Sequence, residues 1–166
     1  MRILPLALVV ATLACRRAPP APAAPAESAP PPPITTTDRD SEMNAAMAEG
    51  KKTLPRFLAA LRQPPPGAEG FAVKATFRHG HDVEHMWLHE PRAVGDRFEG
   101  VLANDPAWLD GYRRGQQLSV GRDQIVDWSY IKDGVLVGGH TLRVMFSRVP
   151  AAEREALQTE LGYRFQ

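Results

Sequence analysis

The sequence has one cysteine in 166 residues, Cys15. A single thiol allows no disulfide within the chain, no C-x-x-C metal or redox motif, and no thiol chemistry elsewhere in the sequence. The G-x-S-x-G, H-E-x-x-H and phosphate-loop motifs are also missing. The hydrolase, zinc-protease and nucleotide-binding classes that those motifs identify are therefore not indicated.

The chain also lacks an excess of charge of either sign. It contains 20 Lys/Arg and 19 Asp/Glu, of which 17 and 18 lie in residues 38–166. The basic pI of the whole chain comes from Arg2, Arg16 and Arg17, which precede that region. A nearly neutral domain without a basic patch or an aromatic platform argues against nucleic acid as a partner.

The apolar run near the N-terminus, Ile3 to Leu13, is broken only by Pro5 and is too short to span a bilayer, which takes about 20 residues. It follows the positively charged Met1-Arg2 and precedes small residues around Ala14. This pattern is typical of a secretory signal peptide, which we expect over residues 1–14. The protein is therefore predicted to be exported to the bacterial cell envelope or periplasm.

Cys15 directly follows this segment in the sequence TLAC, residues 12–15. The four residues resemble a bacterial lipobox, in which the cysteine is acylated with chains such as palmitate and becomes the mature N-terminus. Thr12 and Leu13 depart from the usual residues, and ordinary signal cleavage is the alternative. Acylation predicts that the membrane is a partner through Cys15, because two or three acyl chains anchor a protein firmly.

Eight of the 16 prolines lie between Ala18 and Pro33, interspersed with alanine. Such a segment cannot bury enough apolar surface to offset its ordering entropy. We expect residues 15–37 to form the anchor cysteine and a disordered tether, and residues 38–166 to form a single domain.

The domain is predicted to begin and end with helices. Methionines and leucines at helical spacing indicate a helix over 41–62, capped by Asp40 or Ser41 and kinked or divided by Gly50 and Pro55. A second helix is expected over 151–161, between Pro150 and Gly162.

Alternating apolar and polar residues predict strands between these helices. Phe71, Val73, Ala75 and Phe77 alternate with polar or small residues, and a hairpin leads to a strand over 83–89 that Pro91 closes. Further strands are expected over 97–103, 117–120, 125–131 and 135–137, whereas 140–149 fits either a strand or a helix. The fold class is α+β, with a mostly antiparallel curled sheet.

Several short motifs together resemble the bacterial domain-of-unknown-function family 2314. They are EHMWL at 84–88, F-x-G-x-L-x-N-x-P at 98–106, I-x-DW at 125–128 and GG-x-T-x-R at 138–143, with TLP-x-F at 53–57 and F-x-VK at 71–74. The resemblance covers Met43 to Arg148, and His140 departs from the aromatic residue associated with its position. It implies a compact α+β domain and no established reaction, and some relatives lie near toxin–immunity systems.

Four of the five histidines fall within twelve residues: His79, His81, His85 and His89. In an extended strand His85, Trp87 and His89 would share a face, and the hairpin turn could bring the others near. Zinc or copper binding through this cluster is one alternative. Because no specific ligand spacing is present, we expect no metal and no other cofactor, and only His85 belongs to the resembling motif.

An enzyme would use Glu84, His85, Asp127 and Arg143, since these supply acids, a base and a cation. A hydrolase built on Glu84, His85 and Asp127 is therefore the alternative function. However, no nucleophile and oxyanion donor complete the set. A buried ion pair between Asp127 and Arg143 is the preferred structural explanation, and capping of a short turn by Asp127 is another.

A binding or interaction module of the cell envelope fits the sequence best. Trp87, Trp108 and Tyr112 are residue types that are enriched at interfaces, and we predict that they bind an envelope protein partner. Trp108 could equally belong to the core, because large aromatic side chains are mostly buried. A role as an inhibitor or immunity-type protein is one form of this hypothesis.

Overall fold

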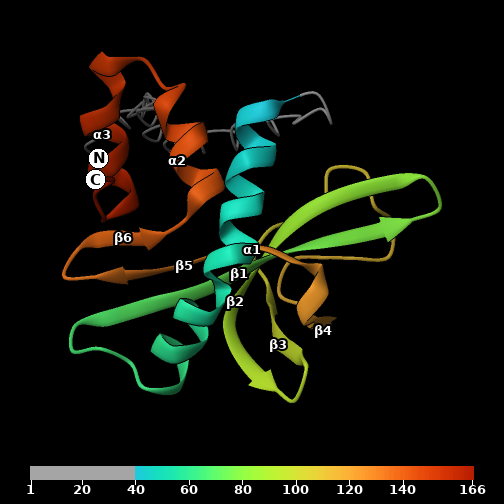
Figure 1. Ribbon diagram of the computed structural model, residues 1–166. Helices are drawn as coiled ribbons and strands as arrows, with labels where there is room; N and C mark the ends of the chain where they lie inside the picture. The colour runs from blue at the N-terminus through green and yellow to red at the C-terminus, as the bar shows by residue number, and fades with distance from the viewer. Residues whose placement is uncertain (1–39) are drawn as a thin grey trace, which may run out of the picture. The chain divides into compact units, whose positions relative to one another are not determined.

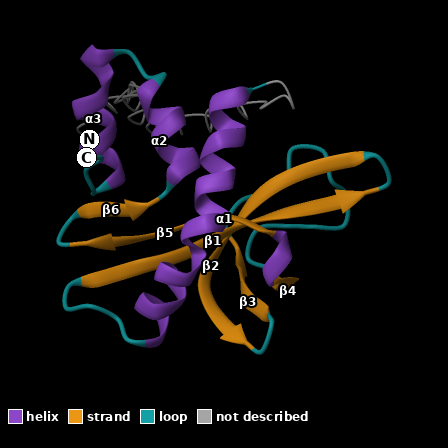
Figure 2. Cartoon of the chain, viewed as in Figure 1, coloured by secondary structure: helices purple, strands orange, loops and turns teal. Residues whose placement is uncertain are grey.

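The computed structural model describes residues 40–166. The predicted signal peptide, Cys15 and the tether lie outside the described residues. The domain has an N-terminal helix, a six-stranded sheet in the order β4-β3-β2-β1-β5-β6, and two short helices at its C-terminal end (Figures 1 and 2). All neighbouring strands pair antiparallel. The α+β prediction is confirmed, and the sheet is not closed.

The first helix, α1, is continuous from Ser41 to Arg62. Asp40 caps it by accepting a hydrogen bond from the backbone N–H of Met43 at 3.1 Å. The helix is not divided at Gly50 and Pro55, so the alternative of two short helices is wrong. Pro55 lies on the exposed face, where the carbonyl that loses its N–H partner can bind water. Gly50 is buried because α1 crosses β5 at this point, as described below.

Strands β1 (Ala68–His79) and β2 (Asp82–Val94) form the predicted hairpin, with His79 opposite Asp82. The strand does not stop at Pro91, which is a correction to the sequence prediction. The register with β3 shifts between His89 and Arg92, and Glu90 adopts φ 53°. A β-bulge of this kind lets a strand accommodate proline and continue.

The remaining strands extend the sheet on both sides of this hairpin. On one side lie β3 (Arg97–Leu102) and β4 (Gln117–Gly121), and on the other lie β5 (Ile125–Lys132) and β6 (Val135–Gly138). A short 3-10 turn, η1 (Arg122–Gln124), connects β4 to β5, which crosses over to pair with β1. The pairing of β2 with β3 begins at Leu88, so the loop after β3 runs past the first half of β2.

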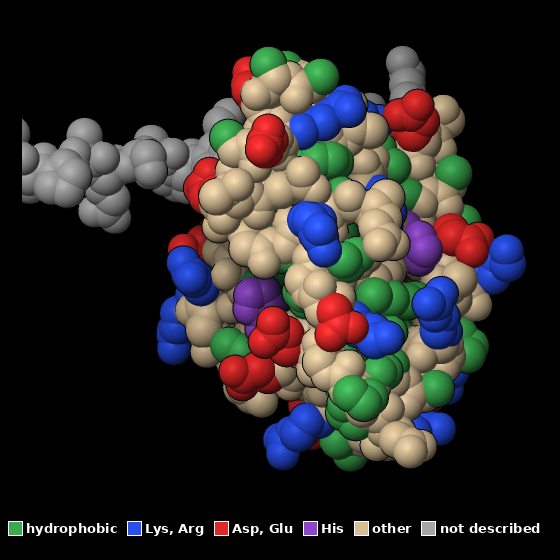
Figure 3. Space-filling view, turned by 90° about the vertical axis from the view of Figure 1, so that its left-hand side faces the viewer, with side chains coloured by type: hydrophobic (Ala, Val, Ile, Leu, Met, Phe, Trp, Pro, Cys, Tyr) green, Lys and Arg blue, Asp and Glu red, His purple; other side chains and the backbone are tan. Residues whose placement is uncertain are grey.

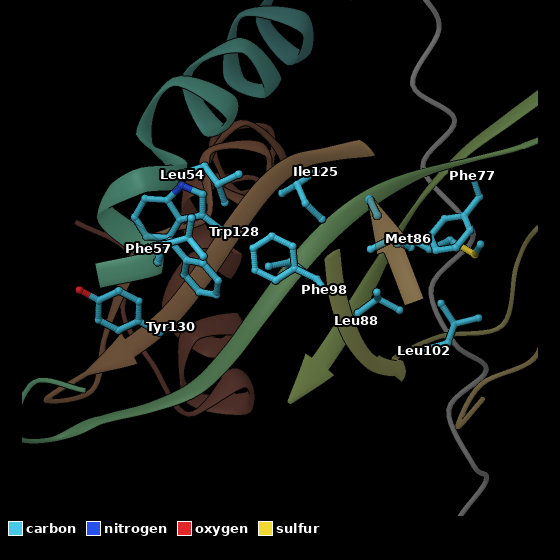
Figure 4. Packing of buried hydrophobic residues seen from close by; sticks show 14 of the residues in the cluster. Leu54, Phe57, Phe77, Met86, Leu88, Phe98, Leu102, Ile125, Trp128 and Tyr130 are labelled. Atoms are coloured by element: carbon cyan, nitrogen blue, oxygen red, sulfur yellow. The ribbon is translucent and has the colours of Figure 1, made fainter. Parts of the chain in front are cut away.

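The core lies between α1 and one face of the sheet. Phe57 of α1 is fully buried, and its ring centroid is 5.4 Å from that of Trp128 and 6.4 Å from that of Phe98 (Figure 4). Val73 and Ala75 of β1 and Met86 and Leu88 of β2 are also completely buried. The predicted apolar faces of these strands are therefore confirmed.

Residues 140–149, which the sequence left open between strand and helix, form helix α2 (His140–Ser147). The C-terminal helix α3 spans Arg154–Leu161, after a 3-10 turn η2 (Ala151–Glu153), and ends at Gly162 with φ 74°. In Figures 1 and 2 both helices gather beside the β5–β6 end of the sheet.

On the face shown in Figure 3, acidic and basic side chains are interspersed, in keeping with the near-neutral balance of the domain. Within residues 40–166, no helix combines the length and the apolar character that crossing a membrane requires.

Candidate functional site

A cleft of about 330 Å³ lies where β1 and β2, the loop after β3 and α2 come together. Larger hollows exist, including one of about 540 Å³ beside Lys51, Tyr112 and Asp123. The smaller cleft is the candidate site because it gathers polar residues of the motifs that resemble the family. Its lining includes Lys74, Glu84, His85, Trp87, Asn104 and Trp108.

Lys74 is the buried cation of this cleft. Lys74 is only 9 % exposed. Its side chain lies on the face of β1 opposite to that of Val73 and is covered by the first turn of α2. The Nζ amine donates to Oγ1 of Thr141 at 3.3 Å and lies 5.7 Å from the ring centroid of Trp87. Burial lowers the pKa of Lys74, and the negative charge of Asp127 opposes this effect.

Asp127 lies directly across from Lys74 on β5 and is completely buried. One carboxylate oxygen accepts the backbone N–H groups of Trp128 at 2.8 Å and His140 at 3.1 Å. The other accepts both the backbone N–H and the hydroxyl of Thr141, each at 2.7 Å. Asp127 thus caps the N-terminus of α2, where a negative charge also meets the positive end of the helix dipole.

Arg143 does not form the predicted ion pair with Asp127. Its guanidinium donates instead to the carbonyl oxygens of Leu136 at 2.6 Å, Gly138 at 2.9 Å and Gln166 at 2.6 Å. The preferred pairing of Asp127 with Arg143 is therefore wrong, and the alternative of capping by Asp127 describes the contact. The physical reason is that the N–H groups at the start of α2 lie closer to the carboxylate and saturate it.

Glu84 positions the loop that forms one wall of the cleft. Its two carboxylate oxygens accept the backbone N–H groups of Ala107 at 2.8 Å and Trp108 at 3.4 Å. The next residue in the chain, Leu109, is 2 % exposed and belongs to the core. The hydrogen bonds to Glu84 and the buried side chain of Leu109 hold the loop in place, and Trp108 between them has 48 % of its surface exposed.

The other predicted site residues are distributed unevenly. His85 lines the cleft and shares a 3.1 Å hydrogen bond between Nδ1 and Oγ1 of Thr76. Trp87 and Trp108 both line the cleft. Tyr112 does not, because its ring packs edge-on against Phe77 with centroids 5.3 Å apart. The structure brings together two of the three aromatic residues predicted to bind a partner.

The histidines do not converge as a metal site would require. His79 and His81 are exposed at the hairpin turn, whereas His85 and His89, four residues apart on β2, are separated by about 13 Å at the rise of a strand. Among residues 40–166, no group of three or more His, Cys, Asp or Glu side chains is placed to hold a metal ion.

His140 occupies the position where the resemblance leads one to expect an aromatic residue. Its ring packs edge-on against Trp128 with centroids 5.8 Å apart, and Nε2 lies 3.0 Å from Oγ1 of Thr53. The imidazole therefore makes the ring contact of an aromatic side chain and adds a hydrogen bond to α1.

Reasoning from the sequence missed several residues of the cleft, among them Lys74, Leu142 and Met145. Lys74 was assigned to the outer face of a half-buried strand, and Leu142 and Met145 lay in the segment left open between strand and helix. Trp87 was a usable signal for Lys74: the two residues are paired across β1 and β2, so a large aromatic side chain covers the same face.

Comparisons with known proteins agree with this architecture. A family model described as "Uncharacterized protein conserved in bacteria (DUF2314)" matches residues 40–165, which extends the expected resemblance through α3. "Uncharacterized protein YegJ" of Escherichia coli is 28 % identical over 119 residues, covering 72 % of this chain and 76 % of that protein. No solved structure matches the chain.

A second relative is a longer protein from Neisseria meningitidis serogroup B, described as "Putative ankyrin repeat protein NMB1133/NMB1171". It is 30 % identical over 134 residues, or 76 % of this chain, and the chain spans about half (53 %) of its length. Since the family model covers the whole described domain apart from its last residue, the chain belongs to the bacterial domain-of-unknown-function family 2314.

Proposed function

We propose that the domain is a binding module of the bacterial cell envelope that holds a partner in the cleft beside Lys74. One observation supports this most directly. Several polar residues of the family-like motifs line the cleft, as Lys74, Glu84 and His85 do, and Asp127 holds the start of α2 beside it. An inhibitor or immunity-type protein would act by binding part of its partner in this cleft.

The chemistry of the carboxylates supports binding over hydrolysis. Both oxygens of Glu84 hold the backbone of the 104–108 loop, and both oxygens of Asp127 hold the start of α2. Thr141, whose hydroxyl lies near the Lys74 amine, is completely buried and donates a hydrogen bond to Asp127. A nucleophile has to reach its substrate, and this hydroxyl does not.

The exposed aromatic residue at the rim supports contact with a partner. Trp108 is 48 % exposed although its neighbour Leu109 is buried, and tryptophan is enriched among residues that dominate binding energy. Val94, at the far end of β2, is 52 % exposed and does not line the cleft, so it offers a matched control.

Photo-crosslinking tests the proposal. Full-length protein carrying a photoreactive phenylalanine analogue at position 108 or at position 94 would be expressed in the native host and irradiated in intact envelopes. We expect a crosslinked species of defined mass from position 108 alone, and we expect Trp87→Ala to remove it. Equal yields from both positions, or no product from position 108, would contradict a binding role for the cleft.

Export and lipid anchoring form the second part of the proposal. They are supported by the charged Met1-Arg2, the apolar run Ile3–Leu13 and the cysteine that follows it. Cys15→Ser should release the protein from the membrane fraction into the soluble envelope fraction. Unchanged membrane fractionation of this variant would refute acylation at Cys15.

A further inference from the structure

We infer that the cleft binds the C-terminal end of a partner polypeptide, with Lys74 holding the terminal carboxylate and the apolar wall holding the last side chain. This inference rests on the proposed binding function of the cleft and specifies its ligand. It follows from three features of the cleft: its charges, its apolar lining and its exposed rim.

The charges around the cleft are compensated unequally. Glu84 accepts two backbone N–H groups, and Asp127 accepts three N–H groups and one hydroxyl. Lys74 donates one hydrogen bond, to the neutral hydroxyl of Thr141. The ion pairs formed within residues 40–166 use Lys52, Arg92, Lys132 and Arg148 as cations, and all of these lie away from the cleft.

Lys74 is therefore a desolvated cation that forms no ion pair within the described part of the chain: the charge of Asp127 acts on it without direct contact, and an anion placed against its amine would stabilise it. An ammonium group has three donor hydrogens, and Thr141 uses one of them. The residue is 9 % exposed, and burial lowers the pKa of its amine. A carboxylate placed against Nζ would replace the lost hydration and form a charge-assisted hydrogen bond, which is about twice as strong as a neutral one.

The number of charges favours a monoanion. Lys74 is the one Lys or Arg in the described lining of the cleft, and Glu84 lies in the same lining. A phosphate group, with a charge of about −1.5 to −2, is usually recognised by several cations. A single carboxylate matches a single ammonium, and Glu84 and Asp127 repel it less than they would repel a phosphate.

The apolar part of the cleft accommodates the group attached to that carboxylate. Trp87 flanks Lys74, and Leu142 and Met145 of α2 face the same space. The volume of about 330 Å³ is at the lower end of the range for ligand pockets, about 300–1,000 Å³. It therefore fits one compact apolar side chain together with the terminal carboxylate.

The rim distinguishes a polypeptide from a free acid. Trp108 lines the cleft and yet leaves 48 % of its surface to solvent, and Asn104 beside it is also exposed. These two side chains can contact the residues that precede the C-terminus, and capture of a C-terminal carboxylate is a recurring mode of peptide recognition. A small free acid would leave this rim unused.

Matched ligands test the inference without any variant. The full-length protein in detergent would be titrated by calorimetry with acetyl-alanyl-alanyl-leucine, with the same peptide as its C-terminal amide, and with N-acetyl-leucine. We expect the peptide acid to bind about tenfold or more tightly than the amide, since one charge-assisted contact is lost. We also expect it to bind more tightly than N-acetyl-leucine, because the rim adds contacts.

A pair of variants and a spectroscopic measurement locate the effect at Lys74. Lys74→Met should abolish the preference for acid over amide, whereas Lys52→Met, which alters an exposed lysine of α1, should retain it. Thermal denaturation would establish that both variants are folded. In the wild-type protein the NMR signal of the Trp87 indole N–H should shift when the peptide acid is added and should not shift with the amide. This measurement does not depend on the folding of any variant.

Three results would overturn the inference. They are equal binding of acid and amide by the wild-type protein, an acid preference that persists in Lys74→Met, and N-acetyl-leucine binding as tightly as the peptide. Any of them could occur while crosslinking from position 108 succeeds, in which case the binding function stands and only the ligand is wrong. Loss of the crosslink would contradict the proposed function itself.

Discussion

The two faces of the sheet at β1 and β2 share a backbone and differ in chemistry. On one face Val73, Ala75 and Met86 belong to the apolar core, which has aromatic rings at its centre. On the other face Lys74 and Trp87 lie beneath α2 among buried hydrogen bonds. Burial alone therefore does not mark the core, because both faces are covered. The apolar face supplies hydrophobic stability, and the polar face carries groups whose burial has a cost that a ligand can offset.

The largest effect is expected on the apolar face. Phe57→Ala removes a ring that contacts Phe71, Phe98 and Trp128 and should lower the free energy of unfolding by about 3–5 kcal/mol. Urea denaturation would measure it, with the exposed neighbour Arg56→Ala as a control expected to change by no more than about 0.5 kcal/mol. Similar losses in both variants would mean that α1 is not held by this ring.

A smaller loss is expected where the polar face meets α2. Asp127→Asn replaces an oxygen that accepts backbone N–H groups with an NH₂ donor, so buried donors at the start of α2 lose their acceptor. The free energy of unfolding should fall by about 2–4 kcal/mol. The exposed Asp110→Asn is the control and should be neutral. A fully stable Asp127→Asn protein would instead indicate that the role of Asp127 is functional and not structural.

Lys74→Met should separate stability from binding. The substitution replaces a desolvated amine with an apolar chain of similar length, and Thr141 keeps its hydrogen bond to Asp127. We expect the free energy of unfolding to change by about 1 kcal/mol or less, in either direction, while the preference for the peptide acid over its amide is lost. A large destabilisation without a binding defect would make Lys74 a structural residue and remove the contrast between the faces.

The smallest effect is expected at the surface. Arg148 and the N–H of Met43 lower the pKa of Asp40 to about 2, so the ionised form is favoured in the folded protein. Its stabilising contribution is present above the unfolded value of about 4 and is lost as the pH falls toward 2. Asp40→Asn keeps a helix cap and removes the charge, so its melting temperature should approach that of the wild type at low pH or high salt. A difference independent of salt would contradict this origin.

Periodicity and turn residues predicted most of the fold because they report local preferences. The alternation of Phe71 to Phe77 and the hairpin turn at Gly80 were sufficient for β1 and β2. The pattern failed where tertiary structure overrides a local rule. Pro91 is tolerated because a β-bulge displaces it from the regular ladder, and Gly50 is buried in a continuous helix because β5 approaches it closely.

The site was less predictable than the fold. Trp87, His85 and Glu84 were singled out from one motif, yet the contacts of Glu84 depend on a loop more than twenty residues later in the sequence. Burial of Lys74 depends on α2, which folds back after β6 and cannot be placed from spacing alone. Long-range placement of this kind leaves no periodic signal in one sequence.

The close approach at Gly50 has a mechanical consequence. A Cβ at this position would collide with the backbone of Val126 and lie 2.9 Å from the Cα of Asp127. Helix α1 therefore lies directly on β5, the strand whose Asp127 caps α2. A second contact joins α1 to α2: Arg148, at the C-terminal end of α2, forms an ion pair with Asp40 at the start of α1. A pull applied at residue 40 would load the Asp40–Arg148 pair first and then pass through α1 to β5 and α2, the segments that hold Lys74 in place.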